Sequence, residues 1–267
     1  MKERLDKLLV QRGLAPTREK AQAYILAGQV RVNDSPADKA GARVDADAQI
    51  ALTGKDHPYV SRGGVKLEAA LDAFALDPAG LVCMDIGAST GGFTHCLLLR
   101  GARRVYAVDV GYGQLAWELR THPDVRVLER TNIRHLASDA LPEAMQLIVV
   151  DVSFIALATV LRDAVRFLAP GGAIVGLVKP QFEAGREHVR RGGRVTDAAV
   201  HEAVLAAVRE AGTALGLEAV AQQPSPLLGK KSGNREFLVL WRDVRRPDAA
   251  PLRPPGPAPG PGGGPLV

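Results

Sequence analysis

Two lysines and two carboxylates have the types and positions expected of groups that move a proton. Lys179 directly follows the apolar run 173–178, and Asp151 ends a second apolar run. Lys66 lies in a segment with helical spacing, and Glu236 begins an apolar run near the C-terminus. A neutral lysine can take a proton from a hydroxyl, and carboxylates can hold the amine in place. These four residues are therefore candidates for general base catalysis.

The same four residues also have a structural interpretation. A lysine on a helix and a glutamate at a strand start, such as Lys66 and Glu236, are commonly solvated or form surface ion pairs of little energetic value. Asp151 and Lys179 each follow five or more apolar residues, so this interpretation is weaker for them. The catalytic hypothesis requires that all four meet beyond the carboxyl ends of neighbouring strands, where α/β sheets bind their ligands.

A glycine-rich segment, "VCMDIGASTGGFTHCLL", has the pattern of a strand, a turn and a helix. Glycines in such a turn let the backbone approach a ligand and leave helix N–H groups free to meet it. Asp109 ends the next strand, 24 residues after Asp85, where a carboxylate suits a ribose diol. Asn132, just past the third strand, is placed to meet an adenine edge. The segment predicts an adenosine-containing cofactor.

The type of cofactor follows from what the segment lacks. Neither GxGxxG nor GxxxxGK[ST] is present, so no loop is shaped for a pyrophosphate or a triphosphate. S-adenosylmethionine has a ribose, an adenine and an amino-acid tail but no phosphate, and Asp85 is placed to hold the ammonium of that tail. The alternative is a simple tight turn, with Asp109 as a helix cap. The expected cofactor contacts are Asp85, Gly87, Ser89, Thr90, Gly91, Gly92, Phe93, Asp109 and Asn132.

Methyl transfer from a sulfonium to a hydroxyl is an in-line displacement in which the hydroxyl loses its proton. On this hypothesis Lys179 is the base, and Asp151 and Glu236 orient it. Lys66 and the sulfonium are both positive, so they favour the neutral amine of Lys179, and Lys66 also touches the substrate. Replacing Lys179 by arginine preserves the charge but removes the base.

The elements that would position these groups alternate between strand and helix. Near-continuous apolar strands separated by helical segments predict an α/β fold with a mostly parallel sheet covered on both faces. The last two strands have no helix between them, so we expect an antiparallel hairpin at one edge of the sheet. The predicted strands are 81–86, 105–110, 125–128, 147–152, 173–179, 217–222 and 235–241.

Residues 1–54 have a different pattern and predict a small α+β domain. Leucines recur at helical spacing from Leu5 to Leu14, and Thr17 is placed to cap a second helix that Gly28 ends. The short alternating segments that follow predict a small hairpin. Together they make a compact module.

The rest of the chain divides by composition. Residues 55–61 read as a linker, and residues 62–243 carry the alternating strands and helices. Residues 244–267 contain eight Pro and five Gly among 24 residues, too many for a packed core, so we expect a disordered tail.

Basic residues are concentrated in the helical part of the first module. Residues 1–31 hold seven Lys or Arg against three Asp or Glu, with few aromatic residues that could stack on unpaired bases. This pattern favours recognition of folded RNA by shape and backbone, although each residue alone fits an ordinary charged surface. The candidate RNA contacts are Arg4, Lys7, Arg12, Arg18, Lys20, Arg31, Arg62, Arg190 and Arg191.

Composition and charge exclude several other classes of protein. The net charge is +5 and the pI is near 9.4, which favours a polyanionic partner. The N-terminus lacks the apolar core of a signal peptide, and no apolar run is long enough to span a bilayer. The two cysteines indicate no disulfide framework, and the six histidines show no metal-ligand spacing. We expect a cytoplasmic protein with no membrane or metal partner.

Residues 1 to about 243 resemble the TlyA-type ribosomal RNA 2′-O-methyltransferases, also called the hemolysin A family. "RLDKLLVQRGLAPTREKAQAYILAGQVRVN" resembles the S-four RNA-binding domain, and "YVSRGGVKLEAAL", "DIGASTGGFT", "AVDVGYGQL", "DVSFI", "LVKPQFE" and "GKKSGNREFL" resemble an FtsJ-like methyltransferase domain. The resemblance implies a Rossmann-like class I methyltransferase with a seven-stranded sheet that methylates a ribose 2′-hydroxyl, on cytidine, in ribosomal RNA or ribosomal subunits. The family's Lys-Asp-Lys-Glu tetrad would fall on Lys66, Asp151, Lys179 and Glu236.

Two other functions are open at this stage. A non-catalytic RNA-binding assembly factor would bind ribosomal RNA but transfer no methyl group. A membrane-lytic hemolysin would need a spanning segment or a strongly amphipathic, Lys-rich surface helix, and neither is apparent in the sequence.

Overall fold

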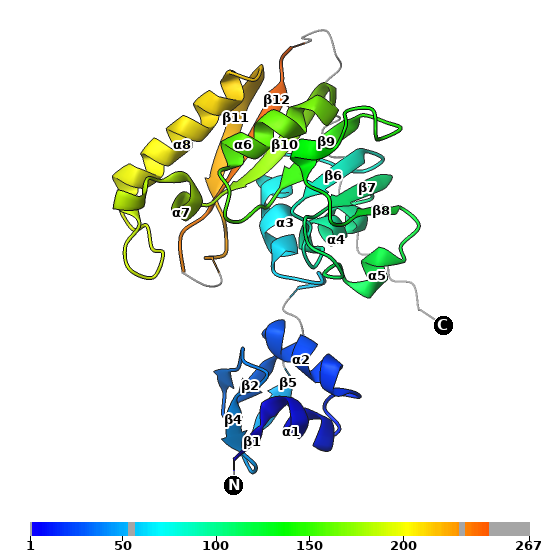
Figure 1. Ribbon diagram of the computed structural model, residues 1–267, viewed down its shortest axis with the longest axis vertical. Helices are drawn as coiled ribbons and strands as arrows, with labels where there is room; N and C mark the ends of the chain where they lie inside the picture. The colour runs from blue at the N-terminus through cyan, green and yellow to red at the C-terminus, as the bar shows by residue number, and fades with distance from the viewer. Residues whose placement is uncertain (1, 53–56, 230–232, 246–267) are drawn as a thin grey trace. The chain divides into compact units, whose positions relative to one another are not determined.

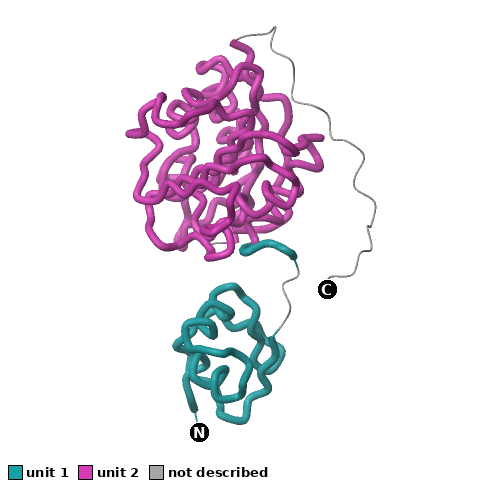
Figure 2. The backbone as a smooth tube through the Cα atoms, turned by 90° about the vertical axis from the view of Figure 1, so that its right-hand side faces the viewer, with its two compact units in different colours: residues 1–61 teal, residues 62–267 magenta. Residues whose placement is uncertain are grey.

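The computed structural model describes residues 2–52, 57–229 and 233–245. The chain divides into two compact units, residues 1–61 and residues 62–267, which are coloured separately in Figure 2. Parts of the expected linker (residues 55 and 56), the basic residues Lys230 and Lys231, and residues 246–267 of the expected tail lie outside the described residues. Each unit is considered by itself below.

The first unit is a small α+β fold. Its elements are β1 (Lys2–Arg4), α1 (Leu5–Gln11), α2 (Arg18–Leu26), β2 (Val30–Val32), β3 (Ser35–Pro36), β4 (Arg43–Asp45) and β5 (Ile50–Leu52). Strand β2 pairs with β3 and β5, and β1 pairs with β4, all antiparallel. The two helices and the hairpin were expected from the sequence, whereas β1 was not, because three residues are too few to show an alternating pattern.

The helix cap and the helix end predicted for the first unit are both found in the structure. The Thr17 side chain accepts a hydrogen bond from the backbone N–H of Lys20 and so caps α2. Gly28 follows the helix with φ of +76°. Asn33 and Asp34 both have positive φ between paired β2 and β3, as a two-residue hairpin turn requires.

The second unit is an α/β fold whose elements are labelled in Figure 1. Its strands are β6 (Val82–Ile86), β7 (Arg104–Val108), β8 (Val125–Leu128), β9 (Met145–Val150), β10 (Leu168–Val178), β11 (Leu217–Pro224) and β12 (Phe237–Asp243). Its α-helices are α3 (Gly63–Ala73), α4 (Gly92–Leu99), α5 (Trp117–Arg120), α6 (Leu157–Ala164), α7 (Pro180–Glu183) and α8 (Ala198–Thr213). Short 3₁₀ turns span Ile133–His135, Val165–Phe167 and Arg186–His188.

The seven strands form one sheet in the order β11-β12-β10-β9-β6-β7-β8. Neighbouring strands from β10 to β8 are parallel, and β12 is antiparallel to both β10 and β11. The mostly parallel sheet and the final antiparallel hairpin are therefore confirmed. Strand β10 starts five residues earlier than predicted, because its first paired residue, Leu168, is separated from Ala173 by a Pro- and Gly-containing irregularity that the sequence pattern reads as a turn.

The core explains why the strands are apolar throughout. Every residue of β6 is buried, so both faces of the sheet are covered. In Figure 1, α6 and α8 lie over the near face, and their residues pack against alternate residues of the central strands. Trp241 is fully buried and fits only because Gly176 and Gly212 oppose it; a Cβ at Gly212 would lie 2.4 Å from its indole nitrogen. No helix in the described ranges has the length and apolar content needed to cross a bilayer.

Candidate active site

The polar residues that follow the parallel strands meet at one edge of the sheet. The backbone N–H of Asp151 donates to the carbonyl of Ile86 (3.0 Å), which joins the ends of β9 and β6. Antiparallel pairing of Val178 with Phe237 places the next residue of β10, Lys179, and the preceding residue of β12, Glu236, at that same edge. The topology thus converts four separate strand ends into one site.

The four candidate catalytic residues form two ion pairs. Lys179 Nζ lies 2.6 Å from Asp151 Oδ1 and donates to Ser153 Oγ at 3.0 Å. Lys66, from α3, has its Nζ 2.5 Å from Glu236 Oε2. Glu236 therefore pairs with Lys66, whereas the sequence hypothesis assigned both carboxylates to Lys179.

Both ion pairs are largely withdrawn from solvent. The Lys179 side chain is 10% exposed, and the Lys66 and Glu236 side chains are 12% and 4% exposed. Charges are costly to bury unless they are paired, and removing one partner of such a pair typically costs about 3–5 kcal/mol. The buried lysine at the end of β10 is thus held at the sheet edge and does not point into bulk water.

Asp85, at the end of β6, carries a buried oxygen that the protein leaves unsatisfied. Its Oδ2 accepts hydrogen bonds from the backbone N–H (2.9 Å) and the hydroxyl (2.7 Å) of Thr94. Its Oδ1 has no hydrogen-bond partner among the described residues, although the side chain is fully buried. Burial raises the pKa of Asp85 to about 7, and the nearby carboxylates of Asp151 and Asp109 add to this shift. A bound cation would satisfy this oxygen, as the ammonium of a cofactor tail can.

Asp109, at the end of β7, organises the glycine-rich turn. Its carboxylate accepts from the backbone N–H groups of Ser89 and Gly111, both at 2.7 Å. These bonds fix the carboxylate in position while each oxygen retains a lone pair for a further donor, such as a ribose hydroxyl. Asn132 uses its side-chain oxygen to cap the turn at Arg134 (3.1 Å), which leaves its amide group for a ligand.

The glycines of the turn are required by the protein as well as by any ligand. A Cβ at Gly87 would lie 2.5 Å from the carbonyl oxygen of Asp151, and a Cβ at Gly91 would lie 2.3 Å from Leu119. The ring of Phe93 is buried in the core. Gly92 begins α4, and Thr90 is exposed beside it. Close packing within the protein is therefore sufficient to explain why glycine occupies positions 87 and 91 and why Phe93 is apolar.

The first unit orients most of its candidate RNA contacts through its own acceptors. Arg4 and Arg18 both bind the fully buried carboxylate of Asp6, at 2.9 Å each. Hydrogen bonding from Arg4 lowers the pKa of Asp6 well below its ordinary value. Arg12 donates to the carbonyls of Ala46 and Ala48, and Arg31 donates to the carbonyl of Asp34, whereas Lys7 and Lys20 are exposed.

The remaining RNA candidates belong to the second unit. Arg62 immediately precedes α3 and donates to the carbonyl of Leu228 at 3.3 Å. Arg190 and Arg191 lie in the loop between the 3₁₀ turn at 186–188 and α8, and both are exposed.

Sequence reasoning missed two kinds of residue at this edge. Thr94 and Ser153 are small polar residues whose contacts with Asp85 and Lys179 become visible only in three dimensions. Phe154 is 84% exposed with φ of +67°, and its ring lies 5.2 Å from that of Phe182. An aromatic residue just after Asp151, in a chain with few aromatics, was the available signal, since an exposed ring can stack on a base.

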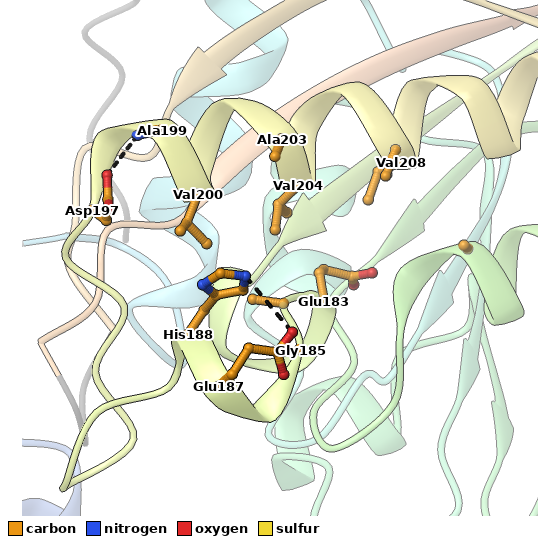
Figure 3. A pocket seen from close by; sticks show the side chains of 13 residues that line it. Glu183, Gly185, Glu187, His188, Asp197, Ala199, Val200, Ala203, Val204 and Val208 are labelled. Carbon is orange, nitrogen blue, oxygen red and sulfur yellow. Dashed lines mark hydrogen bonds and ion pairs between the residues drawn. The ribbon is translucent and has the colours of Figure 1, made fainter.

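A pocket separate from these candidate residues is also present. It has a volume of about 580 Å³ and is lined mainly by alanines and valines of α8 together with Glu183, Glu187 and His188 (Figure 3). None of the candidate catalytic, cofactor or RNA residues lines it. Glu183 instead uses its carboxylate to accept from the backbone N–H of Leu157 (2.6 Å) at the start of α6.

The strand order, the single antiparallel strand β12 and the polar edge together define a class I methyltransferase. The chain belongs to the FtsJ-like methyltransferase family, whose model matches residues 59–243, and it carries an S4 domain matched over residues 3–50. More narrowly, it is a member of the TlyA family, as the sequence motifs predicted.

Individual relatives support this assignment. The chain is 48% identical over 239 residues to the "16S/23S rRNA (cytidine-2'-O)-methyltransferase TlyA" of Mycobacterium tuberculosis, covering 89% of this chain and 88% of that protein. It is 38% identical to "Hemolysin A" of Brachyspira hyodysenteriae, covering 88% and 98%. A solved structure described as a hemolysin from Streptococcus thermophilus matches with a TM-score of 0.73 and 42% identity, covering 91% of this chain and 89% of that one.

Proposed function

We propose that this protein transfers a methyl group from S-adenosylmethionine to the 2′-hydroxyl of a cytidine in ribosomal RNA. The observation that carries the proposal is the position of the Lys179 amine. It is shielded from solvent, paired with Asp151, and located at the sheet edge that also holds Asp85 and Asp109. The relatives named for cytidine 2′-O-methylation of ribosomal RNA supply the substrate. A cytoplasmic location follows from that substrate.

The cofactor residues fit S-adenosylmethionine. The unsatisfied buried oxygen of Asp85 suits the ammonium of the amino-acid tail, and the oriented carboxylate of Asp109 suits the ribose diol. The amide of Asn132 suits the adenine edge. When bound, the cofactor supplies an electrophilic methyl group on a cationic sulfur.

Side chains of the protein would remove the proton of the 2′-hydroxyl group. Lys179 Nζ would take the proton that the 2′-hydroxyl loses as it accepts the methyl group. Asp151 and Ser153 hold that nitrogen in place. Glu236 holds Lys66 at the same edge.

Replacing Lys179 by arginine tests the assignment. Arginine keeps the charge and can keep the pairing with Asp151, but it does not act as a base. We expect methyl transfer to a ribosomal RNA substrate to fall by a factor of about 10²–10⁴, the usual contribution of general base catalysis. Affinity for the cofactor should change little, as measured by calorimetry.

The matched control is Lys39→Arg, the same chemical change at an exposed lysine of the first unit. Near-native transfer by Lys179→Arg would exclude Lys179 as the base. Absence of transfer by the wild-type protein, with tight RNA binding retained, would favour the assembly-factor function instead. Leakage of liposomes by the pure protein would favour the membrane-lytic function.

A further inference from the structure

The loop between α7 and α8 carries four exposed arginines. Arg186, Arg190, Arg191 and Arg194 are all exposed, and within the described ranges none of their side chains makes a hydrogen bond or an ion pair. This distinguishes them from Arg4 of the first unit, whose guanidinium is occupied by Asp6. Unpaired guanidinium groups on one short loop form a surface suited to phosphates.

One buried side chain holds the base of this loop. Asn234 is 2% exposed, and its Oδ1 accepts from the backbone N–H of Val195 at 3.0 Å. Its Nδ2 donates to the carbonyl of Gly193 at 2.7 Å. A single amide therefore fixes two backbone groups of the loop on either side of Arg194.

The same residue belongs to the segment that leads into the active site. Asn234 lies two residues before Glu236, which pairs with Lys66. Its backbone carbonyl accepts from the N–H of Gly229 at 2.9 Å, and a Cβ at Gly229 would lie 2.9 Å from Glu236 Oε1. The arginine loop and the catalytic carboxylate are thus attached to one packed segment.

We propose that Asn234 is a positioning residue that holds the loop 185–195 at the catalytic edge, so that its four arginines bind phosphates of the RNA substrate. The inference rests on the proposed function for the identity of the RNA. An untethered loop would have to be ordered on binding, and that entropic cost would weaken affinity. Asn234 is neither one of the proposed catalytic residues nor one of the proposed cofactor contacts, so its effect should appear in RNA binding.

The test is a double-mutant cycle in the full-length protein. Asn234→Ala should weaken binding of a small-subunit ribosomal RNA transcript about tenfold and raise KM by a similar factor. The value of kcat and the affinity for S-adenosylhomocysteine should stay within twofold. Arg190→Gln/Arg191→Gln should weaken binding comparably and lower the salt dependence of log Kd by about one to two units. In that background, Asn234→Ala should add less than a further twofold.

Three outcomes would overturn the inference. The effects of Asn234→Ala and of the arginine substitutions on Kd could be independent, so that the combined variant shows their product. Asn234→Ala could lower kcat without changing Kd, or the arginine variants could bind RNA as tightly as the wild type does. Arg126→Gln, which removes one exposed positive charge from β8, is the control and should bind normally. If Asn234→Ala loses thermal stability, Asn234→Asp replaces it, because it keeps the acceptor for Val195 and loses only the donor to Gly193. Because Kd is measured without methyl transfer, failure of the proposed function is seen separately.

Discussion

A single oxygen, Oδ1 of Asp85, shows how a buried residue can be prepared for a ligand. The protein satisfies one oxygen of this carboxylate through Thr94 and leaves the other without a partner. An unsatisfied buried acceptor costs about 1–3 kcal/mol, so such groups are rare unless a ligand completes them. Burial of the same carboxylate raises the pKa of Asp85 to about 7.

The affinity for the cofactor should therefore depend on pH. The pKa of Asp85 is about 7, so at lower pH its carboxyl group in the free protein is protonated and cannot attract an ammonium group. Affinity for S-adenosylhomocysteine, which carries the same tail, should be constant above pH 8 and fall toward tenfold per pH unit below pH 6. Calorimetric titrations between pH 5.5 and 8.5 measure this.

The control for the pH dependence is Asp85→Asn. It has the same shape but no titrating carboxylate, so its affinity should be weak and flat across the range. A pH dependence that survives in Asp85→Asn would show that another group causes it.

At the scale of elements, the turn between β6 and α4 is shaped by packing against its own neighbours. Gly91 has φ of +95°, and a side chain there would meet Leu119 and Leu115. Gly113 also has positive φ, +69°, but nothing lies within 4 Å of the position a Cβ would take. A side chain at Gly113 would therefore cause only backbone strain, whereas one at Gly91 would cause both backbone strain and steric clashes.

Alanine substitutions at these two glycines should have different costs. Gly113→Ala should lower the free energy of unfolding by about 1–2 kcal/mol, the cost of a left-handed conformation. Gly91→Ala should lose a further 1–3 kcal/mol or so through overpacking and should also weaken cofactor binding. Urea denaturation of both variants checks this, and equal losses would mean that Leu115 and Leu119 relax without cost.

At the scale of the whole molecule, the chain has two units with separate cores. The first unit has its own buried cluster, including Leu5, Leu9 and Ile25, and the second has the large sheet. Contacts to RNA and contacts to the cofactor should therefore be separable by substitution. The exposed cations of the first unit provide the test.

Replacing Lys7 and Lys20 together by glutamine should weaken RNA binding without affecting the cofactor. Each lost phosphate contact should lower the salt dependence of log Kd by a little under one unit. Filter binding at several salt concentrations measures this, and calorimetry monitors the cofactor. An unchanged salt dependence would indicate that these two lysines do not contact phosphates.

The sequence alone was sufficient to predict the seven strands of the second unit and the edge where polar residues gather. Apolar runs long enough to be buried must form strands, and in a parallel sheet the residues that end them meet on one side. Asp85, Asp109, Asp151 and Lys179 could be placed there because each depends only on its position relative to its own strand.

Only the tertiary structure decided which charges pair and which atoms remain free. Lys66 and Glu236 are 170 residues apart, and their pairing joins α3 to the residue that precedes β12. The contact of Arg18 with Asp6, 12 residues away, and that of Asn234 with Gly193, 41 residues away, likewise join residues separated in the chain. Such contacts form only when packed elements are spaced correctly to within a few tenths of an ångström. No local pattern of residue types specifies that spacing.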